Sequence, residues 1–478
     1  MSIQDNTNLV LYQLPSTTNT SLLDEQPEPI FSVFSEMPQF KYGFYYYIHQ
    51  TKEKMATFET PEFKNKDYQK IINPFEDVVP QEDFIKQFKN DQYRPSDDIN
   101  SFSIKYFQSN KIISRAFYKL WELLMMFPLI SDDLKTMTSI HIAEAPGSFV
   151  QASIYYRYKF FSKNNIDKDV YIATSIEPNT VSNSKNYVPT FGTDLSKFKQ
   201  FKQWRQDDSN ITNPSIIDKF TKEYETTADF VTADGGFNWK NENYQEQEAY
   251  ILLLSEIYCA GKILKQNGNF VIKFFETFTN PTIKLIDILR LLFENVVIVK
   301  PLLSRPSNSE RYIVCLNYKK INNNLLDKLY NIIVECNKHK DKYLVDIFPN
   351  YKIDNGLDIL IKLISVYLSN EQHKQINEMI TYINKASYYG DDYRKYLLNR
   401  RNANDFWISL FYPVSSKDLE KTRKVIFKLI EQSTINIKSQ LDTFSQKINY
   451  NIQIKSPSTK IVDNIVSTKT IKKIKNKK

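Results

Sequence analysis

The feature that most constrains the fold is a regular alternation of strand-like and helix-like segments between residues 113 and 317. Short apolar runs alternate there with segments whose apolar residues recur at helical spacing. Strands separated by helices favour a parallel sheet with helices on both faces. The expected strands are Ser139–Ala143, Val170–Thr174, Phe230–Ala233, Asn269–Phe274, Val296–Val299 and Tyr312–Asn317, and the expected helices are Ser114–Phe127, Gln245–Lys265 and Thr282–Phe293.

The flanking regions differ in composition from this α/β segment. Polar, proline-containing sequence predicts a loosely ordered arm over residues 1–40, followed by an N-terminal extension over 41–110. The extension opens with the aromatic stretch Lys41–His49, which suits a strand. The α/β domain is expected over 111–320, a helical C-terminal domain over 321–432 and a lysine-rich tail over 433–478, with the C-terminal helices at Leu325–Cys336, Leu357–Leu368, Gln372–Lys385 and Lys417–Gln432.

Composition excludes several protein classes. Three cysteines without paired spacing argue against a disulfide framework and a zinc site. The first residues lack the order of a signal peptide, and no apolar run approaches the roughly 20 residues of a membrane helix. We therefore expect a soluble, non-secreted, cytoplasmic protein. The net charge of +8 permits an anionic partner without requiring one.

Two segments place chemistry at strand ends. His141–Gln151 runs from a strand through a turn with Pro146 and Gly147 into a helix, which fits either a ligand loop or a plain strand–helix turn. Asp234 ends a strand and precedes two glycines. A carboxylate there lies at the functional edge of a parallel sheet, although a helix-capping aspartate gives the same pattern.

Two further segments carry charges near apolar strands. Lys273 lies inside a strand of apolar residues, where a lysine is unfavourable unless it is paired or functional. An edge strand that points Lys273 outward is the alternative. The segment Lys300–Cys315 places a polar loop with Arg305, Ser309 and Glu310 between two strands, and a β-hairpin with a solvated tip is equally compatible.

Five ordered motifs carry a resemblance to a known family. They are SRAFYKL (Ser114–Leu120), EAPGSF (Glu144–Phe149), TADGGF (Thr232–Phe237), FVIKFFETFT (Phe270–Thr279) and SRPSNSERYIVC (Ser304–Cys315). In this order they resemble the FtsJ-like ribose 2′-O-methyltransferases, over about Lys111–Lys319. The resemblance is strongest to the cap-specific mRNA branch, judged from the sequences of ADGGF, Asn243–Glu246 and the last motif. That branch includes relatives in large cytoplasmic DNA viruses.

The resemblance implies a Rossmann-like methyltransferase fold and a Lys-Asp-Lys-Glu tetrad formed by Lys119, Asp234, Lys273 and Glu310. A ribose hydroxyl is a weak nucleophile and needs a base aligned with the methyl donor. Our hypothesis makes Lys273 that base, held by Asp234 and Glu310. Lys119 would orient the hydroxyl and, together with desolvation, lower the pKa of Lys273.

The resemblance also implies S-adenosyl-L-methionine as cofactor. Glu144, Ala145, Pro146, Gly147, Ser148 and Phe149 are expected to face its methionine end, although this stretch has fewer glycines than the family pattern. Glu177 is the candidate for its ribose and Asp208 for its adenine side, and Asp234 borders the same site.

RNA is the expected partner. The resemblance to the cap-specific branch implies that this RNA is capped mRNA. Arg115, Arg305, Ser309 and Arg311 flank the tetrad and are candidates for RNA contacts, although Arg311 could equally pair with a local acid. The aromatic run Phe44–Tyr47 could stack a base or pack a strand. The C-terminal helices could hold a protein partner. A ribosomal RNA 2′-O-methyltransferase and a non-catalytic RNA-binding subunit of the same fold remain alternatives.

Overall fold

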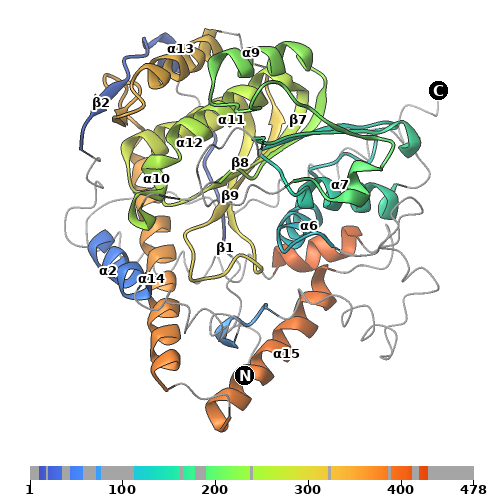
Figure 1. The fold of residues 1–478 in the computed structure, drawn as a ribbon, viewed down its shortest axis with the longest axis vertical. Coiled ribbons are helices and arrows are strands. Elements are labelled where there is room, and N and C mark those ends of the chain that lie inside the picture. Colours follow the sequence, from blue (N-terminus) through green and yellow to red (C-terminus); the bar gives the residue numbers. More distant parts are fainter. Residues whose placement is uncertain are drawn as a thin grey trace, which may run out of the picture.

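A computed structural model places helices around a central sheet (Figure 1). The described residues are 10–17, 20–34, 44–56, 71–76, 112–161, 165–177, 190–236, 239, 241–320, 324–385, 389–411 and 419–428. Within these ranges, none of the helices combines the length and the apolar character that crossing a membrane requires. The expected tail over 433–478 lies outside the described residues.

Among the described residues, eight strands form one sheet in the order β1-β8-β9-β7-β6-β3-β4-β5. Neighbouring strands from β5 to β7 are parallel, whereas β9, β8 and β1 are joined by antiparallel pairings. The strands are β1 (Val10–Gln13), β3 (Thr138–Ile142), β4 (Val170–Thr174), β5 (Phe201–Gln203), β6 (Ala228–Ala233), β7 (Leu264–Phe274), β8 (Phe293–Lys300) and β9 (Arg311–Tyr318).

The six predicted strands all occur, and the Rossmann-like class with helices on both faces is confirmed. The sheet is parallel except at one side, where β8 and β9 form the antiparallel hairpin that the sequence left open as an alternative. Residues 301–310 join β8 to β9 without a helix, and a connection of this length can only return the chain antiparallel.

Helices cover the two faces of the sheet, because side chains alternate along each strand. In β7, Phe270 and Ile272 pack with one hydrophobic cluster, and Val271 between them packs with the other. The first cluster includes residues of α9 (Pro214–Glu223), α11 (Tyr250–Ile263) and α12 (Asn280–Leu292), and the second includes residues of α6 (Ala116–Met126) and α7 (Ser148–Phe160). The shorter helices are α1 (Ser21–Asp24), α8 (Thr193–Ser196), α10 (Gln245–Glu248) and the 3₁₀ turns Ile166–Lys168 and Glu242–Tyr244.

The N-terminal arm contains structure that composition did not predict. Val10–Gln13 pairs with β8 as an edge strand and buries Val10, Leu11 and Tyr12. A second short strand, β2 (Ile30–Ser32), pairs with β10 (Tyr343–Asp346) from the C-terminal part. The prediction of a loosely ordered arm is therefore wrong over these residues, because short apolar runs gain order by pairing with distant partners.

The aromatic stretch near residue 44 forms a helix, not the predicted strand. Helix α2 spans Phe44–Ala56 and packs against α14 (Asn355–Lys385). Ile48, Thr51 and Met55 recur at helical spacing, and Ile48 and Met55 pack with Ile376 of α14. The helical period downstream of the aromatics outweighs their strand propensity.

The C-terminal part is mostly helical, as predicted, but its divisions differ. Helix α13 spans Asn324–Lys338, and the two helices expected over 357–385 are one continuous helix, α14. Helix α15 (Asp391–Phe411) was not predicted, and it returns to pack on α6 (Figure 1). Residues 419–428 are helical within the expected Lys417–Gln432.

Candidate active site

The chain order of the strands creates a topological switch point at one edge of the sheet. After β3 the chain builds outward through β4 and β5, then crosses back so that β6 lies on the other side of β3. Ligands of such sheets bind at this switch point, beyond the carboxyl ends of the strands. The loops that follow β3 and β6 contain Glu144–Gly147 and Asp234–Gly236.

The register of the sheet brings three functional candidates to this edge. Ala233 of β6 is the partner of Ile272 in β7, so the next residues, Asp234 and Lys273, lie side by side. Strand β9 runs antiparallel to β7, with Tyr312 opposite Lys273. Its first residues therefore lie at the carboxyl edge, and Glu310, immediately before β9, reaches the same place.

Lys119 reaches the site from α6, on the face of the sheet toward which Lys273 points. Lys273 alternates with Ile272 and so shares the side of Val271, whose cluster includes α6. Lys119 is half-buried in the first turn of α6, and its Nζ lies 2.6 Å from Glu310 Oε1. The helix therefore supplies the second lysine of the site.

The structure brings together all four residues of the expected tetrad, as two ion pairs. Lys273 Nζ lies 3.1 Å from Asp234 Oδ1 and donates to the Asp234 carbonyl oxygen at 2.9 Å. Lys119 pairs with Glu310 as described. The four side chains are 12–17% exposed, so they are mostly removed from water but still accessible from one side.

Tyr312 is part of this arrangement and was missed in the sequence. Its hydroxyl lies 3.0 Å from Asp234 Oδ1 and 3.1 Å from Glu310 Oε1. One hydroxyl proton serves two carboxylates, so Tyr312 links the two ion pairs. The signal was present in SERY, because residues two apart on a strand share a face and Tyr312 follows Glu310 by two.

Burial and neighbouring charges set the protonation states. Burial raises the pKa of Glu310, but the ammonium groups of Lys119 and Lys273 outweigh it and hold this pKa at about 2. For Lys273, burial lowers the pKa, whereas Asp234 and Glu310 raise it further than burial lowers it. The expected lowering of the Lys273 pKa is therefore wrong for the protein alone, because Lys119 is matched by Glu310 and two carboxylates surround Lys273.

Buried polar groups hold the loop 301–310 that carries Glu310. Lys300 Nζ donates to the carbonyl oxygens of Asn308 and Glu310, at 2.9 and 2.8 Å. Burial lowers the pKa of Lys300 to about 7. Glu122 of α6 accepts from the amides of Leu302 and Leu303, at 2.7 and 3.1 Å.

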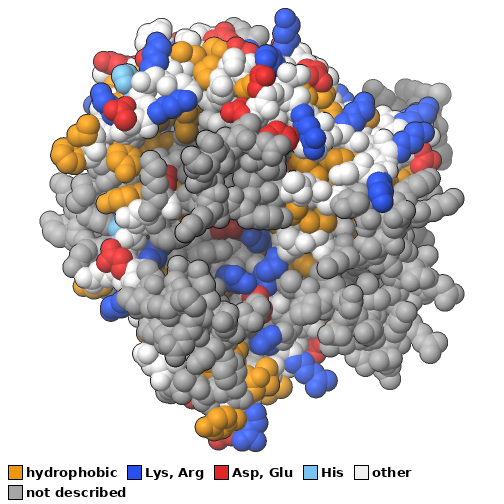
Figure 2. All heavy atoms as spheres, in the orientation of Figure 1, with side chains coloured by type: hydrophobic (Ala, Val, Ile, Leu, Met, Phe, Trp, Pro, Cys, Tyr) orange, Lys and Arg blue, Asp and Glu red, His pale blue; other side chains and the backbone are white. Residues whose placement is uncertain are grey.

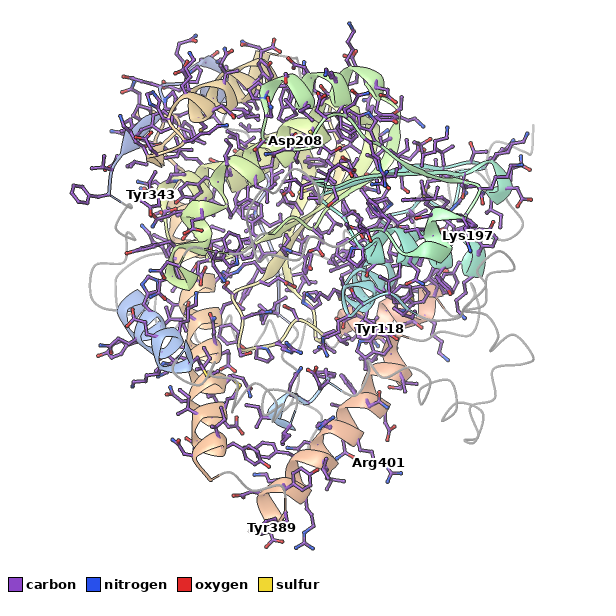
Figure 3. All side chains as sticks on the ribbon, viewed as in Figure 1. Tyr118, Lys197, Asp208, Tyr343, Tyr389 and Arg401 are labelled. Carbon is purple, nitrogen blue, oxygen red and sulfur yellow. The ribbon has the colours of Figure 1, made fainter. Side chains whose placement is uncertain are left out.

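Helix α15 contacts Glu122, one of the groups that hold the loop 301–310, through the side chain of Trp407. Trp407 donates through its indole nitrogen to Glu122 Oε1 at 2.8 Å. Figure 3 shows Tyr118 of α6 at the junction with α15, where its ring packs edge-on against Trp407. The C-terminal helices therefore buttress the helix that bears Lys119.

The loop after β3 offers a buried carboxyl at the switch point. Glu144 Oε1 accepts from the Phe149 amide at 2.6 Å, while Glu144 Oε2 is buried and has no hydrogen-bond partner among the described residues. Burial and the neighbouring Asp234 raise the pKa of Glu144 well above its usual value. Gly147 begins α7 with a φ of 103°, a conformation that favours glycine, so Ala145, Pro146 and Ser148 flank a tight turn.

The two other cofactor candidates lie in adjacent loops. Glu177 follows β4 and Asp208 follows β5, and the Glu177 amide donates to the Asp208 carbonyl oxygen at 3.0 Å. Glu177 Oε1 also lies 3.4 Å from Arg205 Nε. The structure thus brings Glu177 and Asp208 together at the carboxyl ends of β4 and β5.

The four RNA candidates divide into two groups. Arg115 and Arg305 are partly exposed, and both lie against Glu76 of the N-terminal extension. Ser309 donates to Gln245 Oε1 at 2.8 Å. Arg311 is only 2% exposed and donates to Thr277 and to the Ser309 carbonyl oxygen, so an RNA contact by its guanidinium is not supported. The sequence offered a local acid as the alternative partner of Arg311, but its hydrogen bonds among the described residues go to a hydroxyl and a carbonyl oxygen.

A doubly wound α/β sheet with paired lysines and carboxylates beside the switch point defines a Rossmann-like methyltransferase domain. Residues 112–318 match the family described as FtsJ-like methyltransferase.

Curated relatives carry similar sequence over part of their length. The chain is 28% identical over 267 residues to cap-specific mRNA (nucleoside-2′-O-)-methyltransferase 2 of Drosophila melanogaster, covering 54% of this chain and 37% of that protein. It is 28% identical over 302 residues to an uncharacterized protein of Acanthamoeba polyphaga mimivirus, covering 62% and 35%. It is 33% identical over 174 residues to cap-specific mRNA (nucleoside-2′-O-)-methyltransferase 1 of Danio rerio, covering 35% and 21%. The chain therefore matches little more than a third, or less, of the length of these relatives.

Proposed function

We propose that this chain is an S-adenosylmethionine-dependent RNA ribose 2′-O-methyltransferase that acts on the cap-proximal nucleotides of mRNA. The observation that carries the proposal is the meeting of two lysine–carboxylate pairs beside the switch point. The names of the Drosophila and zebrafish relatives favour capped mRNA as substrate. Three free, buried cysteines are compatible with activity in the reducing cytoplasm.

The residues around the switch point fit the proposed cofactor. The buried Glu144 Oε2, which lacks a partner among the described residues, suits the ammonium group of a methionine moiety. The adjacent acids Glu177 and Asp208 suit ribose hydroxyls and an adenine amino group. S-adenosylmethionine supplies the methyl group on a sulfonium, whose carbon–sulfur bond breaks as the ribose oxygen–carbon bond forms.

In this mechanism Lys273 accepts the proton of the 2′-hydroxyl. Asp234 fixes Lys273 through both its carboxylate and its carbonyl oxygen. The raised pKa keeps Lys273 protonated until substrates bind, and Lys273 loses its proton more readily when another cation lies beside it. Lys119, anchored by Glu310, orients the hydroxyl oxygen.

The proposal predicts that Lys273→Ala and Lys273→Arg both abolish methyl transfer, by at least about a hundredfold. Arginine keeps the charge but does not give up its proton, so Lys273→Arg isolates the base function from ion pairing. Lys338→Ala on α13, which removes an exposed charge, should leave turnover unchanged. Near-normal turnover of Lys273→Arg would remove Lys273 from the role of base.

The substrate is tested with capped mRNA oligonucleotides, the same sequences uncapped, and structured ribosomal RNA fragments. Methylation of capped RNA alone agrees with the proposal. Methylation of ribosomal RNA indicates the alternative ribosomal activity, and binding without turnover on any RNA indicates a non-catalytic subunit. A protein partner on the C-terminal helices remains a separate prediction.

A further inference from the structure

Arg115 and Arg305 share one carboxylate at the rim of the active site. Arg305 donates to Glu76 through Nη2 at 2.8 Å and through Nε at 3.1 Å, which is a bidentate contact. Arg115 Nη1 lies 3.1 Å from Oε2 of the same carboxylate, the oxygen that also accepts from Arg305 Nε. The two guanidinium groups are therefore held next to each other.

Both arginines are tied to the catalytic residues by short stretches of chain. Arg115 precedes Lys119 by four residues, about one turn of α6. Arg305 lies in the loop that carries Glu310, and Arg115 Nη2 donates to Leu303 of that loop at 3.0 Å. Because Lys119 and Glu310 are themselves in contact, the arginine pair borders the place proposed for the reacting ribose.

Glu76 is anchored and is not a side chain that moves freely. Asn73 donates to its Oε2 at 2.6 Å, and the neighbouring Phe75 is 1% exposed. Ile71 and Ile72 are buried against Met379 and Ile383 of α14. Burial raises the pKa of Glu76, but the two arginines lower it below its usual value, so it stays ionised at neutral pH.

Glu76 leaves donors of both arginines for another ligand. An arginine has five N–H donors, and Glu76 uses two of those of Arg305. No hydrogen bond of the described residues engages Nη1 of Arg305 or Nε of Arg115, whereas Nη1 of Arg115 is buried against Glu76. One carboxylate against two guanidinium groups also leaves a net positive charge. Figure 2 shows Lys and Arg side chains gathered with acidic ones in a hollow near the middle of the face that is drawn.

We propose that Arg115 and Arg305, held side by side by Glu76, form a binding site for a single phosphate group of the RNA, next to the ribose that is methylated. The inference rests on the proposed RNA substrate. Guanidinium groups bind phosphate oxygens through paired N–H donors, and a pair fixed in advance loses little freedom on binding. Residues 71–76 of the N-terminal extension thereby become part of the RNA site.

A double-mutant cycle tests the single shared phosphate. RNA affinity is measured by fluorescence anisotropy at several salt concentrations for Arg115→Ala, Arg305→Ala and the double variant. Each single variant should weaken binding about tenfold, and the double variant little more than either one. In all three variants the slope of log affinity against log salt concentration should become shallower by roughly 0.7, which corresponds to the loss of one phosphate contact. The shared site would be overturned if the losses of binding free energy in the two single variants add up in the double variant and its salt slope corresponds to the loss of two phosphate contacts.

Glu76→Asp tests the holding role, because it keeps the charge but shortens the side chain. It should weaken RNA binding severalfold, and Glu335→Asp on the exposed face of α13 is the matched control. Unchanged or tighter binding by Glu76→Asp would overturn the role of Glu76. Thermal melting of each variant shows whether it is folded.

The source of the phosphate is distinguished with two RNAs of one sequence, capped and with a 5′-hydroxyl. Equal losses on both RNAs assign a backbone phosphate, and a loss confined to the capped RNA assigns the cap triphosphate. These binding measurements do not depend on methyl transfer. If the wild-type chain binds RNA but does not methylate it, the proposed function fails while the phosphate site is still tested.

Discussion

At the scale of single residues, the site is a balanced set of charges. Lys119 and Lys273 face Glu310 and Asp234, and Tyr312 touches both carboxylates. Such a set can stay buried because each charge has an opposite partner within hydrogen-bonding distance. The same balance keeps Lys273 protonated in the protein alone, so its function depends on what binds beside it.

Replacing Tyr312 by phenylalanine should change the pH dependence of methyl transfer. Without the hydroxyl, Asp234 and Glu310 lose a donor and hold the Lys273 ammonium more strongly. The pKa of Lys273 then rises, and the pH profile of kcat/KM shifts to higher pH, with kcat about tenfold lower near neutrality. The measurement is a steady-state pH profile with separate KM values for RNA and cofactor.

The control for Tyr312→Phe is Tyr318→Phe, which removes a buried hydroxyl that donates to the Gly261 carbonyl oxygen at 2.7 Å. It should lower the melting temperature but leave the pH profile in place. If Tyr312→Phe also melts lower with an unshifted profile, Tyr312 is only a structural residue.

A buried acid behind the Asp234 loop gives the chain a pH-dependent stability. Glu256 of α11 is 1% exposed, and burial raises its pKa to about 8, despite the opposing charge of Lys273. Between its ordinary pKa of 4.5 and 8, the folded state holds a proton that the unfolded state has lost. The free energy of unfolding therefore falls as pH rises through this range, by a few kcal/mol at most.

The substitution Glu256→Gln should remove this part of the pH dependence. Glutamine keeps the shape but does not titrate, so the variant gains stability relative to the wild type between pH 5 and pH 8. Denaturant unfolding at several pH values measures the difference, with the exposed Glu335→Gln as control. Parallel curves for Glu256→Gln and the wild type would contradict the assignment.

At the scale of secondary-structure elements, the central strands and helices could be predicted because their patterns are long and local. The six predicted strands and the helices α6, α11, α12 and α13 follow directly from apolar periodicity. Elements that depend on distant partners could not be predicted in this way. Strand β1 is ordered by β8, and α2 is ordered by α14.

The residues of the site divide in the same way, into those that local sequence motifs identify and those that depend on distant partners. Ordered motifs located Lys119, Asp234, Lys273 and Glu310, and the sheet register explains why they meet. Glu76 carries no motif, and its role arises only because residues 71–76 dock between α14 and the two arginines. Sequence patterns identified the charges of the tetrad and the pairing of Lys273 with Asp234, but not the further partners Tyr312 and Glu76.

At the scale of the whole molecule, the family match and the folded unit have different extents. The match ends at residue 318, and the sequence placed a domain boundary at 320. In the structure, however, α13 and the first half of α14 pack into the same hydrophobic cluster as the sheet. Ser365 of α14 also donates to the Thr277 carbonyl oxygen at 3.1 Å, close to the active edge.

A chain cut at residue 320 should therefore fail to fold cooperatively, although it contains the full family match. The cut removes nine leucine and isoleucine side chains of α13 and the first half of α14 that are at most 4% exposed: Leu325, Leu326, Leu329, Ile332, Ile333, Leu357, Leu360, Ile361 and Ile364. Each such burial contributes about 1.5–3 kcal/mol, so their sum is comparable to or larger than the roughly 5–15 kcal/mol that stabilises a typical domain.

The truncation is compared with a chain cut at residue 428, which retains every helix of the core. Near-ultraviolet circular dichroism and thermal melting should show a sharp transition for the longer chain and a broad, weak one for the shorter chain. Binding of a hydrophobic dye should rise in the shorter chain, because the apolar faces of α11 and α9 beneath α13 are exposed. A single sharp transition of the shorter chain within a few degrees of the full protein would mean that the sheet and its own helices suffice, and that α13 and α14 form a separable domain.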